Sequence, residues 1–199
     1  MPRLRHFLFT ALLITALSSS LRAQGSWMQV PTAHPSSPST FASVPSLCRV
    51  VMVDTGSGFA VGYADIANGV SGVLRKYAGD PTWYIIPVSK FHSLPPNHQL
   101  WAGLWVYDQS IWICGSEGRI YRSSDFGDNW YSSNSGIVGT STLRDIRILC
   151  IRVGIPIVLD GLVVGDNGAV YQTSNGGTNW IPDTLPATVP AGTDLYSLC

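Results

Sequence analysis

The chain has 199 residues, a formal net charge of zero at pH 7 and charged side chains at only 12% of its positions. A neutral chain with so few charges offers no basic surface, which excludes nucleic acid and anionic membranes as expected partners. Its 20 glycines, 13 prolines and 11% aromatic residues favour short β-strands joined by tight turns over helices.

The first 23 residues have the pattern of a secretory signal peptide. A basic front over residues 3–6 precedes an apolar run over residues 7–17, and Ala23 is a small residue that suits a cleavage site. The run is shorter than the about 20 apolar residues of a membrane-spanning helix. We therefore expect export to the periplasm, the extracellular space or the cell surface. The mature chain would begin near Gln24 and would not insert into a membrane.

The composition changes along the mature chain. Residues 24–43 are rich in proline, serine and threonine, and we expect them to form an extended lead-in without a packed element. From residue 44 onward, short apolar runs alternate with clusters of glycine, asparagine, aspartate and serine, and no stretch keeps a 3.6-residue period. This alternation predicts many short strands with tight turns over residues 44–199.

An internal repeat divides this part of the chain into units. The segments 115–130 and 165–180 align without a gap, 50 residues apart, and each follows a strand-like apolar run. A weaker copy over residues 59–83 precedes them. The predicted units cover residues 44–90, 97–139 and 142–186, and residues 193–199 resemble the first strand of a truncated fourth unit.

The length of the repeat predicts the fold. A period of about 40 to 50 residues with four strands per unit is typical of a β-propeller blade, which must stack against neighbouring blades to be buried. The sequence therefore predicts an all-β fold, a partial β-propeller with about three four-stranded antiparallel blades plus the start of a fourth. Because propellers typically use about 4 to 8 blades, we expect the chain to be a fragment of a longer protein.

Both good copies of the repeat contain the motif Ser/Thr-x-Asp/Asn-x-Gly-x-x-Trp. The residues are Ser123, Asp125, Gly127 and Trp130 in the first copy, and Thr173, Asn175, Gly177 and Trp180 in the second. We expect the Asp or Asn oxygen to accept from backbone N–H groups two residues on, the glycine to supply a positive φ, and the hydroxyl to bond locally. The Trp is expected to fold back over its hairpin. Because an uncharged Asn replaces Asp in the second copy, a neutral amide can hold the turn and a formal charge is not needed; the alternative is that Asp125 is catalytic or binds calcium.

These two copies resemble the repeats of Asp-box, or BNR-repeat, propellers. The Gly-x-x-Gly-x-Ile/Val segment before each box is most similar to the Ycf48-like branch, which is related to photosystem II assembly factors, and sialidase and sortilin propellers are more distant. The resemblance covers about residues 44–199. It implies a propeller whose boxes are structural turns away from the active face, but it does not select one function, because one fold supports many.

A sialidase-like enzyme would need an arginine cluster, a Tyr nucleophile with a partner Glu, and an acid/base Asp. Glu117 is the only Glu of the chain, and it lies in a turn between two predicted strands. The Phe-Arg-Ile-Pro signature expected near the start of a sialidase is missing, and no spacing selects a pair of carboxylates for glycoside hydrolysis. We therefore predict no catalytic residue.

Neither the cysteines nor the histidines have the spacing of metal ligands. The cysteines are Cys48, Cys114, Cys150 and Cys199, and the histidines of the mature chain are His34, His92 and His98. We predict no metal site and no cofactor, and we expect the histidines in loops or on the surface. In an exported protein the four cysteines allow three disulfide pairings, and buried free thiols are an equal alternative.

Four arginines are candidates for binding. Arg49, Arg144, Arg147 and Arg152 lie on or beside the predicted first strands of their units. Because the first strand of a propeller blade lines the central channel, these residues could form a cationic mouth for an acidic partner; the alternative is a set of scattered, solvated charges. The loops 63–71 and 90–99 are further candidates, since long loops on a rigid scaffold often carry binding.

The predicted function is that of a secreted, non-catalytic β-propeller that acts as a binding or assembly scaffold for a protein or glycan partner. One alternative is a glycoside hydrolase or sialidase-like propeller whose catalytic residues lie outside this chain. A second alternative is a Ycf48-like assembly factor for a membrane complex, which rests on the style of the repeats.

Overall fold

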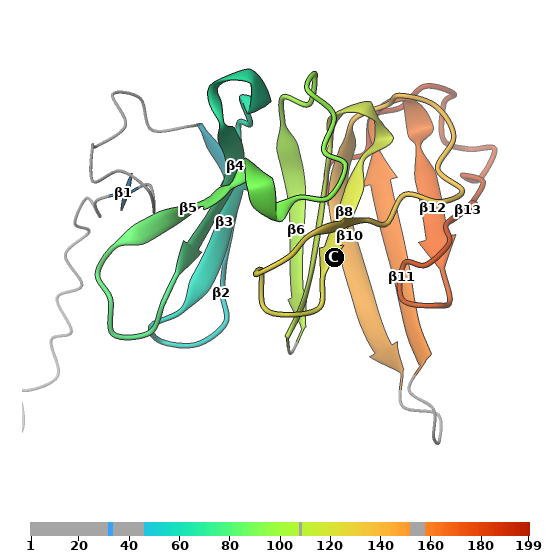
Figure 1. Cartoon of the computed structure of the whole chain (residues 1–199). Helices are drawn as coiled ribbons and strands as arrows, with labels where there is room; N and C mark the ends of the chain where they lie inside the picture. Colours follow the sequence, from blue (N-terminus) through green and yellow to red (C-terminus); the bar gives the residue numbers. More distant parts are fainter. Residues whose placement is uncertain (1–31, 34–45, 108, 152–157) are drawn as a thin grey trace, which may run out of the picture.

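The structure is a computed structural model that describes residues 32–33, 46–107, 109–151 and 158–199. Three antiparallel sheets follow one another in chain order and stand side by side, and they do not close into a ring (Figure 1). Each contains four consecutive strands in the order in which the chain makes them. The predicted all-β propeller architecture is therefore confirmed, and we call the sheets blades 1, 2 and 3.

Blade 1 is formed by β2 (Leu47–Met52), β3 (Gly58–Gly62), β4 (Val70–Lys76) and β5 (Trp83–Pro87). The extra residues between β3 and β4 contain the 3-10 turn η1 (Ile66–Asn68), and η2 (Val88–Lys90) follows β5. Within the lead-in, β1 (Thr32–Ala33) pairs in parallel with β5 and extends the sheet to five strands.

Blades 2 and 3 repeat one pattern. Blade 2 is formed by β6 (Trp101–Tyr107), β7 (Ser110–Gly115), β8 (Ile120–Ser123) and β9 (Tyr131–Ser132), with η3 (Ser116–Gly118) after β7. Blade 3 is formed by β10 (Leu143–Ile151), β11 (Val158–Gly165), β12 (Val170–Thr173) and β13 (Ile181–Pro182), with η4 (Asp166–Gly168) after β11. The four consecutive strands of each blade lie within the residue range predicted for that unit, and β1 lies outside these ranges.

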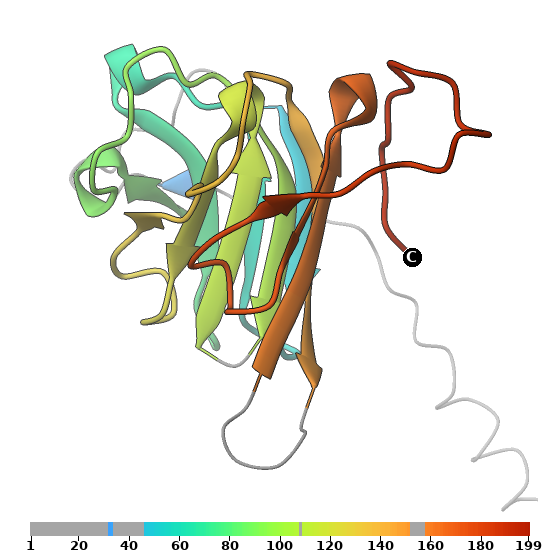
Figure 2. The same ribbon diagram turned by 90° about the vertical axis from the view of Figure 1, so that its right-hand side faces the viewer.

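The first strands β2, β6 and β10 carry the same β-bulge near their beginning. The irregularity falls just before Arg49, Gly103 and Asp145, which therefore occupy equivalent positions. Strand β6 contacts both β2 and β10, and Figure 2 shows blade 2 between its two neighbours. Equivalent positions on the three first strands thus form a row across the array.

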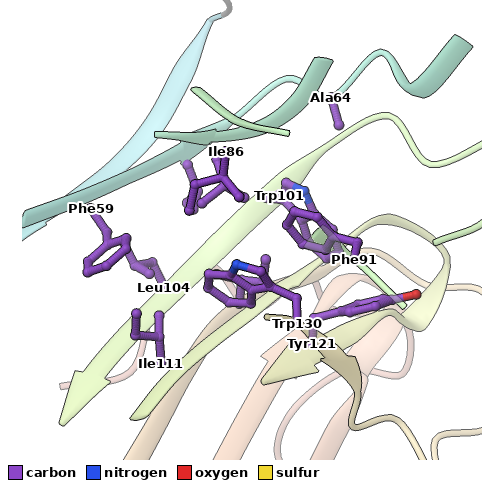
Figure 3. Packing of buried hydrophobic residues seen from close by; sticks show 12 residues of the cluster. Phe59, Ala64, Ile86, Phe91, Trp101, Leu104, Ile111, Tyr121 and Trp130 are labelled. Atoms are coloured by element: carbon purple, nitrogen blue, oxygen red, sulfur yellow. The ribbon is translucent and has the colours of Figure 1, made fainter. Parts of the chain in front are cut away.

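The two larger hydrophobic clusters lie between the blades, and a small third cluster of Ala60, Leu74 and Ile85 lies within blade 1. Between blades 1 and 2, Phe91 stacks on Trp101 (ring centroids 6.3 Å apart) and on Trp130 (5.3 Å), and its ring edge contacts Tyr121 (5.7 Å) (Figure 3). Phe59 of blade 1 belongs to the same buried cluster. A second cluster joins blades 2 and 3; its buried members are Trp112, Cys114, Ile120, Leu143, Ile146, Ile148, Val163, Tyr171 and Trp180.

Trp130 and Trp180 occupy equivalent positions, as predicted, and are 0% and 1% exposed. The backbone N–H of Trp130 donates to the carbonyl of Lys90 at 2.8 Å, and that of Trp180 donates to Ser135 at 2.8 Å. Both acceptors belong to the loop that leaves the preceding blade. Each indole therefore packs between two blades, and the indole N–H of Trp130 also donates to the Gly127 carbonyl of its own hairpin at 3.1 Å, in line with the predicted fold-back. Trp83, from the weaker copy, is only partly buried.

Residues 193–199, the predicted start of a fourth blade, form no strand. A first strand in this array is held by the second strand of its own blade, and residues 193–199 have no such partner in the described part of the chain. They dock on blade 3 instead, through Leu195 N–H to the carbonyl of Gly165 at 3.0 Å. A search of the described residues found no helix with the length and apolar character to cross a membrane.

Candidate functional site

The predicted box of blade 2 (residues 123–130) is a turn closed by its own side chains. The Ser123 hydroxyl donates to Oδ1 of Asp125 at 2.8 Å and accepts from the backbone N–H of Gly127 at 2.8 Å. Oδ1 of Asp125 accepts from the backbone N–H of Asn129 at 2.9 Å. This N–H lies four residues beyond the carboxylate, where the sequence predicted two, because the positive φ of Phe126 and Gly127 curls the chain around the side chain.

The box of blade 3 (residues 173–180) makes the same bonds without a charge. The Thr173 hydroxyl donates to Oδ1 of Asn175 at 2.9 Å and accepts from Gly177 N–H at 3.0 Å. Oδ1 of Asn175 accepts from the backbone N–H of Asn179 at 3.0 Å. Gly177 has a φ of 82°, as the motif predicted. The neutral amide reproduces the turn.

Protonation distinguishes the two turns. Burial acts to raise the pKa of Asp125, but hydrogen bonds from the side chain and the backbone of Asn129 and from Ser123 outweigh it, so the pKa lies below the ordinary value of 3.8. The ionised carboxylate therefore stabilises the turn of blade 2. The amide of Asn175 does not titrate, so the turn of blade 3 has no such dependence on pH.

Both box turns also form part of the seam between blades. A Cβ atom added to Gly127 would lie 2.9 Å from Cε1 of Phe59 in blade 1, and one added to Gly177 would lie 3.2 Å from Nε1 of Trp112 in blade 2. The Ser133 hydroxyl of blade 2 donates to the carbonyl of Gly177 at 2.5 Å. Glycine is thus needed for close contact with the preceding blade as well as for its positive φ.

Arg75 and Arg122, which the sequence analysis did not select, bridge these seams. Arg75 lies opposite Phe59 and Arg122 lies opposite Trp112 in equivalent strand pairs. The guanidinium carbon lies 5.8 Å from the Phe59 ring centroid and 4.9 Å from the Trp112 ring centroid. Each side chain then reaches the box turn of the following blade. The signal was available in the repeat, because both arginines occupy the position that Gln172 holds in blade 3.

Two of the predicted binding arginines, Arg49 and Arg147, share one buried carboxylate. Nη1 of Arg49 lies 3.1 Å from Oδ1 of Asp145, and Nη1 of Arg147 lies 3.3 Å from the same oxygen. The Asp145 side chain is 0% exposed, whereas the arginines are 26% and 29% exposed. Oδ2 of Asp145 accepts from Leu198 N–H at 2.9 Å and from the Ser197 hydroxyl at 3.3 Å.

The ion pair between Arg49 and Asp145 joins blade 1 to blade 3 across blade 2. Gly103 of blade 2 lies between them in the row of equivalent first-strand positions. A Cβ atom at Gly103 would lie 3.1 Å from Cα of Asp145 and would overlap Sγ of Cys114. The missing side chain therefore lets the first strands approach closely enough for Arg49 to reach past blade 2.

Arg144 is also paired with a carboxylate of its own chain. Its Nε and Nη2 donate to the two carboxylate oxygens of Asp166 at 2.7 Å each, and this hydrogen bonding raises the pKa of Arg144. Arg152 lies outside the described residues. The three described first-strand arginines thus have internal partners, and their predicted role in binding an acidic partner stays a prediction.

A pocket of about 640 Å³ opens on blade 3 beside the first strands. The guanidinium of Arg147 lies over the Trp105 ring, 5.1 Å from its centroid, at one side of the pocket. Leu149 and Ile181, which are 58% and 53% exposed, form its apolar side. Oδ1 of Asp160 is buried in the pocket wall without a hydrogen-bond partner.

The histidines and cysteines within the described residues do not form a cluster. No group of three or more possible metal ligands occurs in this part of the chain. His98 lies in a loop, as predicted, but is 1% exposed and packs 3.8 Å from the Trp101 ring centroid. Burial lowers the pKa of His98 to about 4. Cys48, Cys114 and Cys199 are free thiols, and burial raises the pKa of the Cys114 thiol.

Similarity to known proteins is found by structure and not by sequence. No family model and no curated protein matches the sequence. A solved structure of YCF48 bound to D1 peptide is similar, with a TM-score of 0.48 and 18% sequence identity over 69% of this chain and 39% of that chain. More than half of that protein therefore has no counterpart here. The assignment of the fold depends on the three sheets of the chain itself.

Replacing Asp145 with Asn should lower the free energy of unfolding by about 3 kcal/mol, because two arginines lose their buried counter-charge. Urea unfolding at neutral pH measures the change without adding salt. Asp166→Asn is the matched control; the pair it breaks is more exposed, and it should cost about 1 kcal/mol or less. Equal losses in the two variants would contradict the special role of Asp145.

Replacing Asp125 with Asn should flatten the acid limb of the stability profile. The folded pKa of Asp125 lies below the unfolded value of 3.8, so its contribution is full above that pH and is lost as the pH falls toward the folded pKa. At pH 7 the variant should lie within about 1 kcal/mol of the parent, since Asn175 forms the same turn. Urea titrations at a series of pH values test this; parallel acid limbs would show that Asp125 contributes nothing.

Proposed function

We propose that the chain is a non-catalytic binding scaffold for a protein or glycan partner, built as an Asp-box propeller array. The observation that carries the proposal is the pocket on blade 3. Its volume lies in the range of about 300 to 1,000 Å³ that is usual for binding sites. Blade 3, which carries most of the pocket, packs on blade 2 through a shared buried cluster, and Trp105 of blade 2 lines the pocket.

The chemistry of the pocket favours a protein side chain as the group bound. Leu149, Leu162 and Ile181 offer apolar surface, and an exposed apolar patch with a polar rim is typical of interaction sites. Oδ1 of Asp160 can accept a hydrogen bond from a donor of the partner. The Arg147 guanidinium lies over the Trp105 ring and is paired with Asp145. Arg147 therefore forms part of the pocket wall, and its charge is already compensated.

The test is a selection of ligands for the mature chain in three arms. One arm is a displayed random peptide library, the second is an array of glycans, and the third is a solubilised membrane fraction. The third arm is included because the Ycf48-like style of the repeats favours a subunit of a membrane complex as one kind of protein partner. Dissociation constants are then measured for each selected ligand.

Leu162→Asp should weaken binding of a selected ligand by about tenfold or more, because a charge would then face the apolar group that the pocket encloses. The matched control is Val138→Asp, at a side chain that is 74% exposed and lies outside the pocket lining. Thermal unfolding checks that both variants remain folded. The proposal fails if none of the three arms yields a ligand. It also fails if every selected ligand binds the Leu162→Asp variant as tightly as the parent.

We also propose that the chain is exported and begins at Gln24 after cleavage. The support is the basic front, the apolar run and Ala23; these residues lie outside the described part of the structure. Sequencing the N-terminus of protein recovered from a secreting host should start at Gln24. Leu13→Arg places a charge in the apolar run and should leave the chain uncleaved inside the cell. Recovery of exported protein that still begins at Met1 would refute the cleavage.

A further inference from the structure

Two grooves run along the seams between blades, and they are equivalent by the repeat. The first, between blades 1 and 2, contains Arg75 and the box turn of blade 2. The second, between blades 2 and 3, contains Arg122 and the box turn of blade 3. Gly127 and Gly177 are the box glycines of the two grooves, so Asp128 of the first groove corresponds to Thr178 of the second.

The exchange of Asp128 for Thr178 removes the counter-charge of the groove arginine. Nη1 of Arg75 lies 3.0 Å from Oδ1 of Asp128, which neutralises it. Nη1 of Arg122 donates instead to the carbonyl of Gly176 at 3.2 Å. No carboxylate of the described residues forms a salt bridge with Arg122. Arg122 therefore carries an uncompensated charge in a partly buried place, and this burial lowers its pKa.

The second groove is also larger and lined with hydroxyl groups. Its volume is about 380 Å³, against about 190 Å³ for the first groove. The residues that line it are Arg122, Ser124, Tyr131, Ser132, Ser133, Ser135, Gly177 and Thr178. Ser133 and Thr178 donate their hydroxyl protons to backbone carbonyls, so their oxygens remain able to accept from a ligand.

An aromatic wall completes the groove. The Tyr131 ring is stacked on His92, with ring centroids 4.4 Å apart and an angle of 4° between the planes. The side chain is nevertheless 52% exposed, so one part of the ring remains open to a ligand. An aromatic ring beside hydroxyl groups suits a molecule that has an apolar face of C–H groups and several hydroxyls.

We propose that the groove between blades 2 and 3 binds an acidic sugar residue of the uronate type. The sugar carboxylate pairs with Arg122, in the role that Asp128 has in the first groove. The ring hydroxyls donate to the serine and threonine oxygens, and the C–H groups lie on Tyr131. An acidic peptide would supply the carboxylate but not the hydroxyls. The inference goes beyond the proposed function, because it assigns an acidic sugar to a groove other than the blade 3 pocket and has its own test.

The test is an NMR titration of the full mature chain with methyl glucuronide and with methyl glucoside, which lacks the carboxylate. The indole N–H of Trp112 is the reporter, since it is buried without a hydrogen-bond partner in the ring that Arg122 covers. The glucuronide should shift this signal, and the glucoside should bind about tenfold more weakly or worse, because it loses a charge-assisted pair.

Each of two substitutions introduces the residue that another copy of the repeat has at the equivalent position. Arg122→Gln introduces the residue that blade 3 has at this position, and Thr178→Asp introduces the carboxylate of the first groove. Both should weaken glucuronide binding by about tenfold. Arg75→Gln, the control in the first groove, should leave it unchanged. Thr178→Asp alters an exposed position, so it remains informative if Arg122→Gln does not fold.

The proposal is overturned if glucoside and glucuronide bind equally, or if both variants bind glucuronide like the parent. A third probe, N-acetyl-aspartate methylamide, separates the sources of the carboxylate. Binding of this probe through Arg122 in the absence of glucuronide binding would assign the groove to acidic peptides and reject the sugar. Failure of the partner selection at the blade 3 pocket leaves these readouts unaffected, so the two proposals can fail separately.

Discussion

Burial of a blade depends on its neighbours, and the rest of the structure follows from that constraint. The equivalent first-strand positions Val50, Leu104 and Ile146 show it directly: Leu104 and Ile146 each have a preceding blade and are 0% exposed, whereas Val50 is 58% exposed. The side chains are of the same apolar kind, so the difference comes from the packing partner alone. The seams therefore hold the core, and the functional candidates lie along them or at the open face of the array.

Much of the architecture could be predicted from the repeated sequence. The period of the repeat predicted the blades, and the motif at residues 123–130 and 173–180 predicted their turns, because its glycine, hydroxyl and side-chain oxygen act locally and do not depend on distant contacts. The packing of Trp130 and Trp180 into the seam could not be predicted in the same way. It depends on how one sheet stacks on the next, and periodicity within a strand does not report that.

The partners of the arginine side chains could not be predicted from the positions of the arginines in the sequence. Arg49 and Arg147 were selected because they lie on first strands, but their partner Asp145 belongs to the same row and is hidden between them. Aligning the first strands at the bulge would have placed Arg49 and Asp145 in one column. Arg75 and Arg122 do not belong to the residues that the two good copies share, and their surroundings differ by the exchange of Asp128 for Thr178.

The ion pair between Arg49 and Asp145, which passes Gly103, couples the unfolding of the two outer blades. Repeat arrays usually couple only nearest neighbours, so that an end unit can fray while the others persist. Here Arg49 of blade 1 depends on Asp145 of blade 3, and the contact exists only while blade 2 stands between them. Loss of either outer blade removes a support from the other one. The ion pair thereby adds a next-nearest-neighbour coupling to the links between adjacent blades, and it favours melting of the three blades together.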